Sequence, residues 1–174
     1  AASSAVDHLP ASTAACDYFI NFSILKFHAA AITLSGKNHY GSLIRRPPGH
    51  GQWFDMHPSL PLPGSAGEAM GQYRALVDLL GHDGIGGKTF LYLCDGLWGG
   101  YGWGGICPPQ KWRMAPFNSD WPSSLLASQD GIALDSVGYD LLYRDGIVSW
   151  NHHPFAAGTW HAHYPQPDGR DDYL

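Results

Sequence analysis

Residues 88–94, KTFLYLC, form the stretch that decides the fold. Five consecutive apolar or aromatic residues follow its first two positions. A short run without polar alternation predicts a central β-strand that is buried on both faces. Asp95 and Gly96 follow directly, and we expect them to mark the end of this strand. A second apolar and β-branched run, residues 17–27 (DYFINFSILKF), predicts another buried strand.

Outward from these two strands, spacing and composition predict the remaining elements. Apolar residues recur three and four positions apart before Gly81, which is a natural C-terminal cap for a helix. The order of strands and helices predicts an α/β domain with a mainly parallel sheet, flanking helices and long Gly/Pro/aromatic loops. The expected elements are helices at 28–35, 68–81 and 131–143, a strand at 125–128, and loops at 45–67 and 96–123.

Length and composition set the class of protein. The chain has 174 residues, of which 14% are charged and 13% are aromatic, and its net charge is −5. These values predict one ordered domain and argue against a nucleic-acid-binding surface, which is usually basic. No apolar run is long enough to span a membrane. We expect a flexible or processed segment at 1–16, the α/β domain at 17–149, and a His/Pro-rich tail at 150–174 packed on it.

The first residue and the cysteines bear on location. The chain opens with Ala1 and further small residues, which favours a processed protein that is extracytoplasmic or secreted, with the cytoplasm as the alternative. The cysteines, Cys16, Cys94 and Cys107, fit no metal spacing and are odd in number. Their disulfide state is therefore open, and we expect no iron–sulfur cluster on them.

Three segments together resemble one known family. Residues 20–41 hold a strand that ends in Lys-x-His, followed by a Thr, Lys-Asn and a Gly. Residues 90–100 are an apolar strand that runs into Asp-Gly. Residues 125–142 hold Ala-Ser-x-Asp and then Ala-x-Asp-x-x-Gly. This order resembles the family catalogued as domain of unknown function 362, over roughly residues 18–145. Some relatives are described as iron–sulfur proteins, which implies a redox association. The resemblance also implies an incomplete domain, which would be a fragment, a processed product or a diverged short form. Its missing N-terminal part would have been cleaved away or be supplied by a partner.

The best candidate site combines Lys26, His28, Lys37 and Asn38. Lys26 and His28 alternate at a strand end, so their side chains point the same way. We expect Lys37 and Asn38 to return beside them. Lys26, Lys37 and Asn38 would then hold a small anionic ligand, and His28 would transfer protons. Surface charges that cap loops are the alternative.

Three carboxylates complete the candidate set. Asp95 follows a buried strand, and Asp135 lies on the apolar side of a helix, where it needs a partner. Either one is expected to bind a cation, such as a divalent metal, or to orient His28. Asp130 is a candidate ligand residue. A strand-closing turn at Asp95 and a helix N-cap at Asp130 are the structural alternatives.

Other functions use the tail and the aromatic loop. His161 and His163 would place two imidazoles on one side of an extended segment, as a metal site requires. Tryptophans and tyrosines crowd residues 98–121, which suits a non-catalytic extracellular protein that binds partners or forms homo-oligomers. A carbohydrate-active protein that stacks sugars on these rings is a third hypothesis. A loop folded onto the core is the structural alternative.

Overall fold

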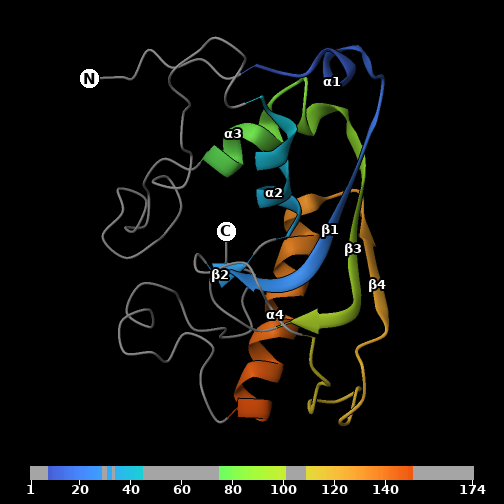
Figure 1. The fold of residues 1–174 in the computed structure, drawn as a ribbon, viewed down its shortest axis with the longest axis vertical. Helices are drawn as coiled ribbons and strands as arrows, with labels where there is room; N and C mark the ends of the chain where they lie inside the picture. Colours follow the sequence, from blue (N-terminus) through green and yellow to red (C-terminus); the bar gives the residue numbers. More distant parts are fainter. Residues whose placement is uncertain (1–7, 29–30, 33, 45–74, 101–108, 151–174) are drawn as a thin grey trace, which may run out of the picture.

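The computed structural model describes residues 8–28, 31–32, 34–44, 75–100 and 109–150 (Figure 1). The predicted strands at 17–27, 88–94 and 125–128 and the helix at 131–143 are confirmed, whereas residues 68–74 of another predicted helix lie outside the described residues. In chain order the elements are α1 (Ala11–Ala15), β1 (Phe19–His28), β2 (Ala31–Ile32), α2 (Ser35–Asn38), the 3-10 helix η1 (His39–Ser42), α3 (Ala75–Gly81), the 3-10 helix η3 (Gly86–Lys88), β3 (Thr89–Gly100), β4 (Ser124–Ser128) and α4 (Gly131–Trp150).

The sheet is mixed, with strand order β2-β1-β3-β4. Only β1 and β3 are parallel; β2 is antiparallel to β1, and β4 is antiparallel to β3. The prediction of a mainly parallel sheet is therefore wrong. A parallel pair needs a crossover connection, and α2 and α3 supply one between β1 and β3. The described part of the connection from β3 to β4 contains no helix, and β4 returns antiparallel.

A helix was expected at 28–35, but the described residues of this segment hold an antiparallel strand pair and only the first residue of a helix. Ala31 and Ile32 form β2, which pairs with His28 and Phe27 of β1. Helical structure begins only at Ser35, the first residue of α2. Alanine has high intrinsic helix propensity, but pairing of Ala31 with the end of β1 overrides that weak preference.

Strand β3 is longer than its apolar run. It continues to Gly100, and both Asp95 and Gly96 lie inside it. Asp95 pairs with Leu125 of β4, and Gly96 pairs with Ser124. The expectation that the strand ends before Asp95 is therefore wrong. Hydrogen bonding to β4 keeps the backbone extended where the sequence alone suggests a turn.

The two faces of the sheet differ in burial. We call the open face the side formed by Ile20, Phe22 and Ile24 of β1, Leu91, Leu93 and Asp95 of β3, and Leu125 and Ala127 of β4. The side chains of Ile20, Phe22 and Ile24 are each 55% exposed. Helices α2, α3 and α4 lie on the opposite side, the covered face (Figure 1). The prediction that the central strand is buried on both faces is therefore wrong.

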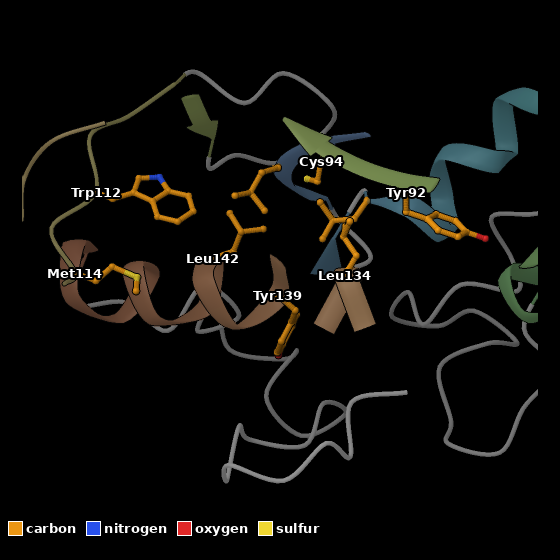
Figure 2. Packing of buried hydrophobic residues seen from close by; sticks show 9 residues of the cluster. Tyr92, Cys94, Trp112, Met114, Leu134, Tyr139 and Leu142 are labelled. Carbon is orange, nitrogen blue, oxygen red and sulfur yellow. The ribbon is translucent and has the colours of Figure 1, made fainter. Parts of the chain in front are cut away.

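The main core lies between α4 and the covered face. Figure 2 shows Leu134 and Leu142 of α4 pointing toward the strand that carries Tyr92 and Cys94. Gly138 lets α4 come close, because a Cβ atom there would lie 2.5 Å from Leu34 Cδ1. Burial of these apolar side chains is the main favourable contribution to folding. A second cluster contains Tyr40, Ala75, Leu79 and Ile85.

The segment at 8–16 is attached to the domain. Lys88 Nζ donates hydrogen bonds of 2.8 Å to the carbonyl oxygens of Ala14 and Cys16, which holds the end of α1. His8 forms an antiparallel bridge with Ile44. Most of the predicted tail, residues 151–174, lies outside the described residues. Within the described ranges, no helix is both long enough and apolar enough to cross a membrane.

Candidate functional site

Asp135 joins α4 to α2. Its two carboxylate oxygens accept hydrogen bonds from the backbone amides of Ser35, at 2.7 Å, and Gly36, at 2.9 Å. These amides belong to the first turn of α2, where backbone N–H groups lack partners within the helix. Burial raises the pKa of Asp135, although the hydrogen bonds from Gly36 and Ser35 oppose this shift. The partner that the sequence demands for this carboxylate is thus the backbone of α2.

Asn38 is held by β1 rather than aimed at its end. Its Nδ2 donates to Asn21 Oδ1 at 2.7 Å and to the Phe22 carbonyl at 3.3 Å. Asn21 Nδ2 in turn donates to the carbonyl oxygen of Ser35 at 2.8 Å. Phe22 lies four residues before Lys26, about 13 Å along an extended strand. Asn38 therefore lies beside the first half of β1 and does not join Lys26.

Lys37 and Asp130 also have local partners. Lys37 Nζ lies 5.1 Å from the ring centroid of Tyr40, within the range of a cation–π contact. Asp130 Oδ1 accepts hydrogen bonds from the amides of Ile132, at 2.9 Å, and Ala133, at 3.1 Å. This is the geometry of an N-cap at the start of α4, the structural alternative expected for Asp130.

Lys26 and His28 lie at the carboxyl end of β1. Lys26 pairs with Gly100, the last residue of the parallel strand β3, so the two strands end at one edge of the sheet. The backbone of His28 pairs with Ala31, and its side chain is outside the described part. Ligands of α/β sheets bind at such carboxyl ends. Lys26 and His28 are therefore the candidate residues that lie at such an end.

Asp95 lies on the open face, away from Asp135. It occupies one row with Ile24 on β1 and Leu125 on β4. Asp95 Oδ1 accepts a hydrogen bond of 2.9 Å from the amide of Leu97. Among the described residues, its second oxygen has no hydrogen-bond donor. The sheet separates Asp95 from the α2–α4 contact, so the two candidate carboxylates do not share a site.

His39 is a buried residue that lies outside the candidate set. It is 2% exposed, and its ring makes edge contacts with Phe19 and Tyr92, each with centroids 6.4 Å apart. Burial lowers its pKa to about 4. In the sequence, the one feature that points to His39 is its position directly after Lys37 and Asn38.

Hydrogen bonds define the tautomer of His39. Thr89 Oγ1 donates its hydrogen to the Ile85 carbonyl at 2.9 Å and lies 3.4 Å from His39 Nε2. The Thr89 hydroxyl therefore accepts, and Nε2 carries the ring hydrogen. Nδ1, 3.3 Å from Ser42 Oγ, is then free to accept from that hydroxyl. The neutral ring thus satisfies both nitrogens, which is a structural role.

The tryptophans do not form one surface. Trp112 is fully buried beside Phe117, with ring centroids 5.2 Å apart, whereas Trp98 is 56% exposed. Lys111 Nζ lies 5.9 Å from the ring centroid of Trp121. Part of the aromatic segment is thus folded onto the core, and Tyr101 and Trp103 lie outside the described residues.

The proposed metal ligands His161 and His163 lie outside the described residues. Within the described part, no group of three or more His, Cys, Asp or Glu side chains is close enough to hold a metal ion. Cys16 and Cys94 are free thiols, and Cys107 lies outside that part. Burial raises the pKa of Cys94 to about 11, so this thiol stays protonated at neutral pH.

Fold and sequence together define the class of protein. A mixed sheet with helices on one face, carrying a Lys-x-His strand end and an Asp-capped helix, is an α/β domain. The chain belongs to the family described as Domain of unknown function (DUF362), whose model matches residues 4–140. Comparison with curated proteins finds no match, and neither does comparison with solved structures.

Proposed function

We propose that this protein binds a small anion at the carboxyl ends of β1 and β3, with Lys26 and His28 as its ligands. The observation that carries the proposal is the pairing of Lys26 with Gly100, because it brings the ends of two parallel strands to one edge. Gly99 and Gly100 are themselves buried, with the Trp112 ring against Gly99, so the side chains of β1 rather than the backbone of β3 would bind the ligand. Lysine and histidine are natural partners for phosphate or carboxylate groups.

The roles of the other candidate residues follow from their contacts. Asn38, Asp130 and Asp135 position α2 and α4 through hydrogen bonds. Lys37 contacts the ring of Tyr40, and its part in anion binding is tested with a separate variant. An anion held next to His28 would be close to an imidazole, the side chain that most often transfers protons in catalysis, which makes acid–base chemistry the reaction type to test first.

Titration of the full chain with inorganic phosphate, followed by amide NMR spectra, tests the site. The double variant Lys26→Ala/His28→Ala removes both ligands. The control is Lys111→Ala/His8→Ala, which removes one lysine and one histidine at other places in the fold. Lys111 forms a surface ion pair with Asp120, and the backbone of His8 is paired with Ile44. Asp95→Asn is a separate variant, titrated with Mg²⁺ and Zn²⁺, to test whether that carboxylate binds a cation.

We expect phosphate to shift the amides of Lys26 and Gly100 in the parent protein and in the control. The shifts should vanish in the Lys26→Ala/His28→Ala variant while its spectrum stays folded. Equal shifts in that variant would show that the anion does not use these residues. Loss of phosphate binding in the Lys37→Ala variant as well would show that Lys37 also contributes to the anion site.

A second function, a non-catalytic protein that assembles through its aromatic segment, is favoured by Leu97 and Trp98. They are adjacent in β3 and are 44% and 56% exposed. Sedimentation of the parent protein and of Trp98→Ser tests it, with the exposed Val77→Ser on α3 as the control. Dissociation of an oligomer by Trp98→Ser alone would support assembly, whereas a monomeric parent protein at high concentration would contradict it.

A further inference from the structure

The open face is a second surface of interest, independent of the anion site. Alternate residues of β1 point to opposite sides, and register aligns Ile20 with Leu91, and Phe22 with Leu93. Ala127 and Leu125 extend these rows onto β4. Large side chains of β1 and β4 are thus exposed on this face, and Leu91 and Leu93 of β3 between them are half-buried. Parallel strands in folded proteins are normally covered on both faces.

The shape of the open face suits a helix. From Ile20 to Ile24 the apolar row extends about 13 Å along β1, which equals the length of about nine helical residues. Helices are the elements that cover parallel strand pairs, as α4 does on the covered face (Figure 1). A helix with one apolar side would bury these rows.

Charge narrows the choice of occupant. Among the eight described residues that define the open face, Asp95 alone is charged. It lies on the central strand, β3, with Ile24 and Leu125 on either side. One of its oxygens is without a donor among the described residues. Two copies packed face to face would bury two carboxylates without counter-charges, which is costly. A partner with a basic side chain at this position would instead neutralise Asp95.

We propose that the open face binds an amphipathic helix whose apolar side covers Ile20, Phe22 and Ile24 and whose single lysine or arginine pairs with Asp95. The interaction is a helix laid on a sheet, in which apolar contacts supply affinity and the ion pair sets the register. This inference does not depend on the anion site, because it uses neither Lys26 nor His28.

The test uses the full chain and two hydrocarbon-stapled helical peptides that are identical except for one residue. Both have leucines at positions i, i+3, i+4 and i+7; one has a lysine, and the other a glutamate, at the position facing Asp95. Binding is measured by fluorescence anisotropy, and methyl NMR locates it. The variants are Asp95→Lys, Phe22→Ser on the open face and, as a control, Val77→Ser on α3.

We expect the lysine peptide to bind the parent protein about tenfold or more tightly than the glutamate peptide, with methyl shifts at Ile20 and Ile24. Asp95→Lys should reverse this preference, Phe22→Ser should weaken both peptides, and Val77→Ser should change neither. Equal binding of the two peptides, or no methyl shift at millimolar lysine peptide, overturns the proposal. The proposal is also overturned if these methyl groups are already buried in the free protein, either in a dimer or by other residues of the same chain.

Discussion

The carboxylate of Asp135 accepts a hydrogen bond of 2.7 Å from the backbone amide of Ser35, a residue 100 positions earlier in the chain. The same carboxylate accepts from Gly36. A helical residue near the end of the domain thus fixes the start of a short helix near its beginning. Helix α2 is only four residues long, too short to be stable through its own hydrogen bonds.

Asp135→Asn should therefore destabilise the protein by about 1–3 kcal/mol, because the amide group of Asn would point one donor at a backbone N–H donor. Urea unfolding at pH 7 measures the effect. Asp130→Asn is the matched control; asparagine caps helices about as well as aspartate, so its cost should stay within about 0.5 kcal/mol. Equal costs in the two variants would show that the contact between Asp135 and α2 contributes little.

His39 should make stability depend on pH. Its pKa falls from an ordinary 6.5 to about 4 on folding, so between these values the unfolded chain binds more protons than the folded one. The free energy of unfolding should thus rise with pH through this window, by on the order of 3 kcal/mol, with no further contribution from His39 to the pH dependence below about pH 4.

Urea unfolding from pH 4 to 7 tests this dependence. His39→Phe, which fits an aromatic ring between Phe19 and Tyr92, should remove most of the rise. His8→Gln, at an exposed histidine, should keep it. A rise of the same size in His39→Phe would assign the pH dependence to other groups.

Gly138→Ala should destabilise the contact between α4 and the sheet. The added methyl group would lie 2.5 Å from Leu34 Cδ1 and 3.2 Å from Leu25 Cδ1, and both leucines are buried in the core. We expect a loss of about 1–3 kcal/mol, despite the higher helix propensity of alanine. Gly41→Ala, where the methyl group would meet nothing within 4 Å, is the control for thermal unfolding. A more stable Gly138→Ala variant would show that the core has room.

Adjacent residues of β1 test the difference between the two faces. Leu25 is fully buried on the covered face, so Leu25→Ala should cost about 2–5 kcal/mol of stability. Ile24 is 55% exposed on the open face, so Ile24→Ala should lower the free energy of unfolding by about 1 kcal/mol or less. Equal costs in denaturant unfolding of the isolated chain would mean that the open face is already covered in solution.

The candidate site was only partly predictable from the sequence. The Lys-x-His end of β1 and the N-cap position of Asp130 follow from local spacing. The expected return of Lys37 and Asn38 to the end of β1 does not occur for Asn38, because Asn21 and the Phe22 carbonyl bind its amide earlier on the strand. Polar residues inside an apolar strand, such as Asn21, were the available signal.

By itself the sequence determined where β1, β3, β4 and α4 lie, since apolar periodicity and glycine positions are local properties. It also determined that Asp135 needs a partner on the apolar side of a helix. Tertiary structure alone decided that this partner is α2, that Asp95 lies inside β3, and that the sheet is mixed. The physical reason is that β1 and β3 have apolar residues on both sides. Only packing against α4 determines which side is buried and which is left open.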